Sequence, residues 1–155
     1  MDEVTYTDLL SPFERDIQKP TPKDKKYRKT WYIVEFIEKD DSGLAIHSDD
    51  SEATRNMKRT RMSTINTQLN TYTKTAVSLL RNKINELNMD EEQCTWKNVP
   101  AHLKQQCYQD IELYAKKANI NLDRCIDSWG AKVLAAHQYP NANRKAKVSF
   151  QMKCI

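Results

Sequence analysis

The chain has 155 residues, 39% of them hydrophobic and 30% charged, and it carries a formal net charge of +4. This length suffices for one ordinary domain, or for a compact helical domain with an extension. Its two glycines are too few for glycine-rich phosphate-binding loops or many-stranded β folds, both of which need residues with positive φ. The composition therefore predicts a mainly α protein whose helices are joined by short loops.

Positive charge is concentrated in three runs along the chain. These are Lys19, Lys23, Lys25, Lys26, Arg28 and Lys29; then Arg55, Lys58, Arg59 and Arg61; and finally Arg144, Lys145, Lys147 and Lys153. An acidic stretch from Glu38 to Glu52 separates the first two runs. Charge that is segregated in this way suits docking onto a polyanion or onto a partner of opposite sign, although a solvated surface explains any single run equally well.

Cysteine usage predicts reduced thiols in an intracellular protein. The four cysteines are Cys94, Cys107, Cys125 and Cys154. No pair has the two-residue spacing of a zinc knuckle, and no secretory signal precedes them, so we expect no metal and no cofactor. The alternative is a zinc site formed by Cys94, His102, Cys107 and His137, although these spacings match no known ligand pattern. No segment approaches the roughly 18 apolar residues that a membrane span requires, and neither a membrane nor a small-molecule substrate is an expected partner.

The N-terminal residues predict an extended basic arm over 1–28. Pro12, Pro20 and Pro22 interrupt it, and it contains at most one short helix, around Asp8–Ile17. Such an arm either stays disordered or lies along a partner.

Residues 29–46 predict a β-hairpin. The segment KTWYIVEFIEK (29–39) is dense in aromatic and β-branched residues, and the polar turn 40–43 separates it from a second apolar run at 44–46. An isolated hairpin is barely stable, and the near-continuous apolar run indicates burial on both faces. We therefore expect residues 29–70, the hairpin and the start of a helix, to dock onto a partner. The expected contact residues are Trp31, Tyr32, Ile33, Val34 and Phe36.

Three helical patterns follow the hairpin. Apolar residues recur at spacings of three and four over about 51–87, which predicts one long helix, or two that are separated near 70–73 by β-branched threonines. A second helix is predicted over 100–117, because it opens on a proline, which suits a first helical turn. A third is predicted over 122–137, because an asparagine precedes it as a cap and Asp123 is favourably placed in its first turn.

The last two helices, together with the end of the long one at about 74–88, are the parts of a helix-turn-helix domain. The segment IDSWGAKVLAAH, residues 126–137, looks like a third helix built around a tryptophan. On these features residues 72–147 resemble the homeodomain-like family, and the resemblance assigns 71–155 to a homeodomain-like helical domain with a basic tail. It implies that the outward face of the third helix and the basic residues near it meet duplex DNA. The implied contacts are Arg124, Lys132, Arg144, Lys145 and Lys147.

One position departs from the homeodomain pattern. Homeodomains place an asparagine three residues after that tryptophan to read adenine, and this chain has Lys132 there. Because lysine is a point-charge donor, this position favours phosphate binding without the usual base readout.

Homeobox-like proteins of this size, with extra flanking segments, also occur as small non-catalytic subunits of eukaryotic DNA N6-adenine methyltransferase complexes. The resemblance implies a nuclear accessory subunit whose partner chain carries the catalytic motif and the methyl-donor site. The sequence has no paired-glycine loop, nucleophile elbow or HExxH-like helix, so we expect no independent catalysis. The resulting hypothesis is a non-catalytic DNA-binding and assembly subunit, and the alternative is a protein–protein adaptor without nucleic-acid contact.

Overall fold

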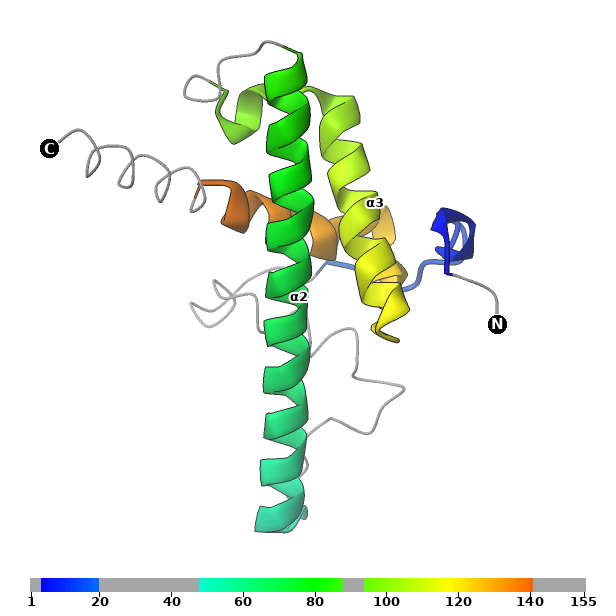
Figure 1. Ribbon diagram of the computed structural model, residues 1–155. Helices are drawn as coiled ribbons and strands as arrows, with labels where there is room; N and C mark the ends of the chain where they lie inside the picture. The colour runs from blue at the N-terminus through cyan, green and yellow to red at the C-terminus, as the bar shows by residue number, and fades with distance from the viewer. Residues whose placement is uncertain (1–3, 20–47, 88–93, 141–155) are drawn as a thin grey trace, which may run out of the picture.

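The computed structural model of the protein describes residues 4–19, 48–87 and 94–140 (Figure 1). Within these ranges the elements in chain order are η1 (Tyr6–Asp8), α2 (Glu52–Glu86), η3 (Trp96–Asn98), α3 (Ala101–Lys117), η4 (Leu122–Arg124), η5 (Ile126–Ser128) and a last helix over 129–140. The prediction of a mainly α protein is confirmed. The predicted hairpin at 29–46, with Trp31, Tyr32, Ile33, Val34 and Phe36, lies outside the described residues, as does the basic tail.

Helix α2 is one uninterrupted helix of 35 residues, which decides between the one-helix and two-helix predictions. Ser51 caps its N-terminus by accepting a hydrogen bond from the amide of Thr54 at 3.1 Å. The threonines near its middle do not break it. The hydroxyl of buried Thr73, for example, donates to the carbonyl of Leu69 at 2.7 Å and so needs no other partner. The helix therefore runs through the domain boundary that was predicted between residues 70 and 71.

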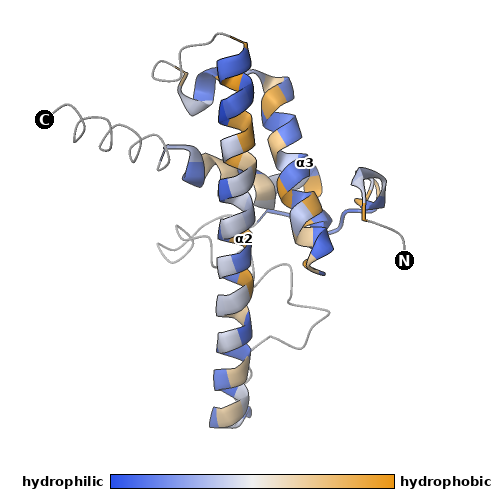
Figure 2. Cartoon of the chain, in the orientation of Figure 1, coloured by the Kyte–Doolittle hydropathy of each residue, from blue (hydrophilic) through white to orange (hydrophobic). Residues whose placement is uncertain are grey.

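The core lies where one face of α2 meets α3 and the last helix, and Figure 2 shows apolar residues on the facing sides of α2 and α3. The buried apolar residues of α2 recur mostly at spacings of three and four: Met62, Ile65, Leu69, Ala76, Leu80 and Ile84. Helix α3 contributes Leu103, Cys107, Ile111 and Ala115. At its N-terminal end α2 extends well past α3 (Figure 1), so α3 does not cover the first turns of α2. No helix in the described ranges is long and apolar enough to cross a membrane.

An aromatic cluster anchors the end of the last helix. The ring centre of Trp96 lies 5.3 Å from that of Tyr139 and 6.3 Å from that of Tyr108. The guanidinium of Arg81 lies 4.1 Å over the Tyr139 ring and donates to the backbone carbonyl of the same residue at 2.7 Å. The tilted ring contact with Trp96 holds the last helix against η3, and the cation–π contact and hydrogen bond of Arg81 hold it against α2.

The prediction of a helix over 122–137 is wrong at its start. The two short 3-10 turns η4 and η5 occupy 122–128, and the helix begins at Trp129, which is 4% exposed and lies in the core. Cys125, between the turns, is extended (φ −68°, ψ 123°) and pairs with Ile17 in an isolated parallel bridge. Asp127 and Ser128 then have positive φ values of 56° and 57°. Left-handed backbone is unfavourable for residues other than glycine, so tertiary contacts must hold it in place.

Candidate nucleic-acid interface

The N-terminal arm packs against its own chain. The amide of Ile17 donates to the carbonyl of Arg124 at 3.0 Å, and the carbonyl of Ile17 accepts from the amide of Ile126 at 2.9 Å. The indole Nε1 of Trp129 also donates to the Ile17 carbonyl, at 2.9 Å. The sequence predicts an arm that is disordered or lies along a partner, whereas residues 4–19 lie against α3 and the turns before the last helix (Figure 1). They thereby cover one edge of the unit that was predicted to face DNA.

A buried ion pair fastens the arm to α3. Two guanidinium nitrogens of Arg15 donate to the carboxylate of Glu112, at 2.7 and 3.0 Å, and the two side chains are 10% and 1% exposed. Arg15 also donates to the carbonyls of Leu10 and Cys125 and to the hydroxyl of Ser128. Burial raises the pKa of Glu112, and the hydrogen bonds and charge of Arg15 offset this only in part. The pair therefore serves to hold the arm in place.

Two further carboxylates bind the arm. Asp123, which was predicted in the first turn of a helix, is fully buried. Its Oδ2 accepts from the amide of Leu10 at 2.9 Å and from the ammonium of Lys116 at 3.1 Å. The phenol of Tyr6 donates to Asp110, and this hydrogen bond, with burial, raises the pKa of Tyr6 to about 12. The sequence analysis missed these structural roles, because acidic residues in polar segments are usually solvated.

Arg124, one of the predicted DNA contacts, is bound within the chain. Its Nε and Nη2 donate to the two carboxylate oxygens of Asp16, at 3.0 and 2.7 Å, and its side chain is 14% exposed. The hydrogen bonds from Arg124 lower the pKa of Asp16. This bidentate pair uses the same donor fork that grips a phosphate, so a phosphate would have to displace Asp16.

Lys132, the other predicted contact within the described ranges, is exposed on the last helix. Its ammonium lies 5.9 Å from the centre of the Tyr108 ring. It lines two open clefts of about 330 and 360 Å³, one against the arm and one beside Trp129. Arg144, Lys145 and Lys147 lie outside the described residues, so their phosphate contacts stay a prediction.

Among the described residues, the largest group of cations lies on α2. Residues 53–85 contain seven Lys and Arg residues and no Asp or Glu. Three of the seven are engaged within the chain: Arg55 donates to the carbonyl of Ser48, Lys58 pairs with Asp50, and Arg81 binds Tyr139. The other four are exposed, and their side chains make no hydrogen bond or ion pair in the part of the chain that the structure describes: Arg59, Arg61, Lys74 and Lys83.

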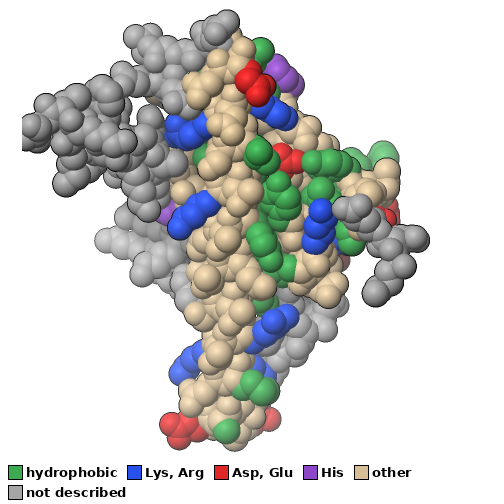
Figure 3. Space-filling view, viewed as in Figure 1, with side chains coloured by type: hydrophobic (Ala, Val, Ile, Leu, Met, Phe, Trp, Pro, Cys, Tyr) green, Lys and Arg blue, Asp and Glu red, His purple; other side chains and the backbone are tan. Residues whose placement is uncertain are grey.

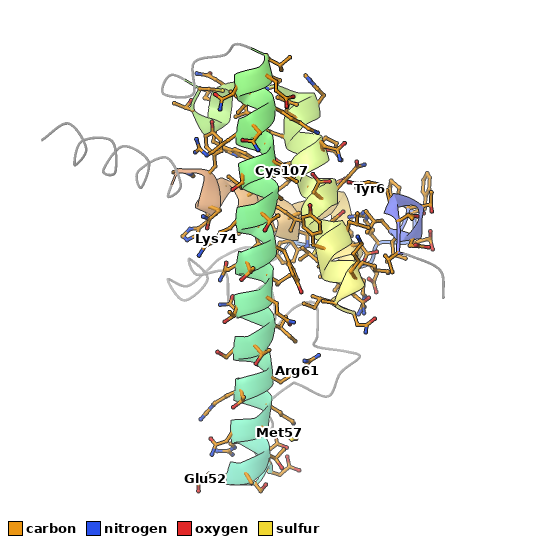
Figure 4. All side chains as sticks on the ribbon, viewed as in Figure 1. Tyr6, Glu52, Met57, Arg61, Lys74 and Cys107 are labelled. Carbon is orange, nitrogen blue, oxygen red and sulfur yellow. The ribbon has the colours of Figure 1, made fainter. Side chains whose placement is uncertain are left out.

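These free cations lie on two sides of α2. Figure 3 shows Lys and Arg side chains along both edges of the helix, with a broad uncharged strip between them. Figure 4 shows Lys74 and Arg61 pointing to opposite sides. The sequence analysis identified only the run that ends at Arg61. The signal that it missed was the absence of acidic residues from the rest of the helix.

The alternative zinc site is not assembled. Cys94, His102, Cys107 and His137 all lie in the described ranges, and no three His, Cys, Asp or Glu side chains in those ranges converge in a way that could hold a metal. Burial raises the pKa of the Cys107 thiol to about 12. This cysteine is therefore a protonated core residue, since metals bind the thiolate.

Comparison of the chain with family models, curated proteins and solved structures found no match. The functional argument therefore rests on the residues and their geometry.

Proposed function

We propose that the chain is a non-catalytic subunit that binds double-stranded DNA, chiefly through phosphates, and that belongs to a larger assembly. The observation that carries the proposal is the acid-free span 53–85 of α2, whose four unpaired cations have no partner in the described chain. Lys and Arg side chains near phosphates release counterions from the duplex, and this release supplies the sequence-independent part of DNA affinity.

The charge pattern of α2 is unusual for a helix that faces only water. Acidic and basic residues four positions apart stabilise exposed helices, yet the acids of α2 stand only at its first and last positions, Glu52 and Glu86. Apart from Lys58, which pairs with Asp50, the cations along the helix therefore repel one another without a compensating acid on α2 between residues 53 and 85. A polyanion lying along α2 would remove this repulsion, whereas a solvated face offers no reason to exclude acids over such a length.

The homeodomain-like resemblance supplies further proposed contacts. Lys132 is exposed, and we propose that it contacts phosphate together with Arg144, Lys145 and Lys147. Arg124 joins them only if a phosphate displaces Asp16. The same resemblance makes a nuclear DNA N6-adenine methyltransferase complex the proposed assembly, with catalysis on a partner chain.

A salt titration of duplex binding tests the proposal. The purified full-length chain should bind a DNA duplex at low salt, and the logarithm of its affinity should fall linearly and steeply with the logarithm of the salt concentration. Reversing the charges of Arg144, Lys145 and Lys147 together then locates the contact. A smaller slope assigns part of it to the tail, and unchanged binding assigns it to the basic arm or to α2. No measurable binding at low salt would overturn the proposal.

A protein-binding adaptor is the second candidate function. Apolar side chains are exposed on α2 at Met57 (67%) and Leu79 (40%) and just after it at Leu87 (54%), and exposed apolar groups are the usual contacts of a protein partner. This candidate predicts no duplex binding at low salt. It also predicts that a partner recovered by pull-down from native extract is retained when the cations of α2 are neutralised.

A further inference from the structure

We infer that α2 itself enters the major groove of B-form DNA, with its outward face toward the base edges and one cation on each side of that face, Arg59 and Arg61, against the phosphate backbones. The inference rests on the proposed function and names the surface and the mode of binding. The outward face consists of seven exposed hydroxyl residues, which we call the threonine face: Thr60, Ser63, Thr64, Thr67, Thr71, Thr75 and Ser78.

The threonine face lies opposite the buried face of α2. Its members recur at spacings of three and four, so they share one side of the helix. Thr67, at its centre, lies roughly 160° around the helix axis from buried Leu69, because each residue turns the helix by about 100°. No acidic residue lies between Thr60 and Ser78, Lys74 shares this side of the helix by rotation, and Figure 3 shows a broad uncharged strip along the front of α2.

The hydroxyl groups of the threonine face are oriented by the helix. Thr64, Thr67 and Thr71 each donate to the carbonyl four residues earlier, at 3.0 Å. Each bond uses the hydroxyl hydrogen and leaves an oxygen lone pair and a methyl group for an external partner. Base edges in the major groove offer matching groups, namely the amino donors of adenine and cytosine and the methyl group of thymine.

The choice of threonine on this face works against the helix. Threonine is a poorer helix former than Ala, Glu or Lys, which usually occupy exposed helical positions. Five threonines nevertheless stand on the outward face, where packing within the described chain does not require them. A conflict between local preference and structure of this kind is expected at functional surfaces.

Cations border the threonine face on both sides. By helical rotation Arg59 and Arg61 lie about 100° to either side of the centre of this face. Lys74 lies within the face, about 20° around the axis from Thr67, whereas Lys83 lies on the side toward α3, where it lines a small cleft with Leu103 and Gln106. A helix is about 10–12 Å across with its side chains, and the major groove of B-form DNA is about 12 Å wide. A helix in that groove therefore has a phosphate backbone along each edge, where Arg59 and Arg61 lie.

Duplex DNA fits this surface better than a protein does. A second copy of the chain would bring the same acid-free, cationic edges, and like charges placed together disfavour association. The centre of a protein interface is rich in apolar and aromatic side chains, and the threonine face has none. An acidic helix of a protein partner would pair with the cations at the edges of the face but would offer no matching groups to the hydroxyls at its centre. The tests below include a probe for such a partner.

Single neutralisations of the full-length chain test the two edges. The variants are Arg59→Gln, Arg61→Gln and, as a control, Lys117→Gln at an exposed residue off α2. Each α2 variant should reduce the slope of log affinity against log salt by about 0.9, the value for one phosphate contact. The control variant should leave the slope unchanged. A reduction from only one of the α2 variants would overturn the groove geometry, because the helix would then touch DNA along a single edge.

Substitutions on the threonine face separate binding from folding. Thr67→Glu should lower duplex affinity by at least about tenfold, because it places an acid beside the phosphates, whereas Gln105→Glu on α3 should not. Changing Thr64, Thr67 and Thr71 together to alanine should raise thermal stability, because alanine is the better helix former, and should weaken duplex binding. Unchanged affinity in the alanine variant would overturn the inference.

A duplex of RNA distinguishes this inference from the proposed function. The major groove of A-form RNA is deep and too narrow for a helix, so DNA of the same sequence and length should bind at least about tenfold more tightly. Equal affinity for the two duplexes overturns groove insertion but leaves phosphate binding in place. No binding to either duplex overturns both. Binding to poly-glutamate as tight as to DNA would assign α2 to an acidic protein partner and overturn the inference.

Discussion

Replacing Arg15 with leucine should destabilise the protein by about 3–4 kcal/mol at pH 7 and by much less at pH 5. Glu112, which is 1% exposed, would stay buried without its counter-charge, and removing one partner of a buried pair costs about 3–5 kcal/mol. Glu112 can limit this penalty by taking up a proton. At pH 7 that uptake costs about 3.7 kcal/mol for a carboxyl with an ordinary pKa near 4.3. This value is therefore the most that the unpaired charge of Glu112 can subtract from the free energy of unfolding.

The pH dependence of this variant has a definite sign. Burial raises the folded-state pKa of Glu112, and loss of Arg15 raises it further. For a carboxyl with a raised pKa, the penalty is complete above the folded pKa and disappears as the pH falls toward the unfolded value. Between pH 7 and pH 5 this maximum loss drops by about 2.7 kcal/mol, at about 1.36 kcal/mol for each pH unit.

Urea unfolding at the two pH values measures these free energies. The double variant Arg15→Leu with Glu112→Leu removes both charges and should recover most of the lost stability. A loss at pH 7 below about 1 kcal/mol, the range of a solvent-exposed pair, would refute the reasoning. Equal losses at pH 7 and pH 5 would refute it as well, because Glu112 would then not be the group that responds.

Three further substitutions probe the arm and the core. Asp16→Asn should lower stability slightly at pH 7, because the hydrogen bonds from Arg124 favour the charged carboxylate and lower the pKa of Asp16. The difference in unfolding free energy from the unmodified protein should vanish as the pH falls through that lowered pKa. A difference that persists in acid, measured by urea titration, would contradict this. Trp129→Phe removes the 2.9 Å hydrogen bond to the Ile17 carbonyl and should lower the free energy of unfolding by about 1 kcal/mol. Hydrogen exchange at the Ile17 amide should become faster. Unchanged exchange would mean that the indole does not hold the arm. Ile65→Ala, at a side chain 1% exposed, should cost about 2–5 kcal/mol of unfolding free energy, and a loss under about 1 kcal/mol would place Ile65 outside the core.

Helices α2 and α3 could be predicted because their signals are local. Apolar residues at spacings of three and four mark the buried face of each, and Pro100 stands directly before the observed helix Ala101–Lys117. The one-helix or two-helix choice for α2 could not be made from the sequence, because threonines lower helix propensity but are tolerated where their hydroxyls bond to the preceding turn.

The start of the last helix and the state of Arg124 could not be predicted, because distant residues determine both. Asp16 and Ile17 reach Arg124 and Cys125 across more than a hundred positions, and no local pattern reveals such a pairing. The burial of Asp123 could not be predicted for the same reason. Its position in the sequence suits a first helical turn, whereas in the structure its buried carboxylate accepts a hydrogen bond from the distant amide of Leu10. The candidate contacts on the last helix were chosen by resemblance, which carries no information about the arm.

The cationic surface of α2 could be found only in part from the sequence. The absence of acids from 53–85 is visible there. Which cations remain unpaired is not, because Lys58 and Arg81 look as available as Lys74 until the structure shows the contacts of the first two with Asp50 and Tyr139. That Lys74 shares one side of the helix with the threonine face follows once α2 is known to be continuous.

The change in salt slope caused by two variants tests most directly whether α2 is the DNA-binding surface. One variant replaces Arg59, Arg61 and Lys74 with glutamine, and the other replaces Lys132 alone. The slope of log affinity against log salt should fall by about 2.7 in the first variant, at about 0.9 for each of three phosphates, and by no more than about 0.9 in the second. A slope that is unchanged in the first variant would contradict the claim.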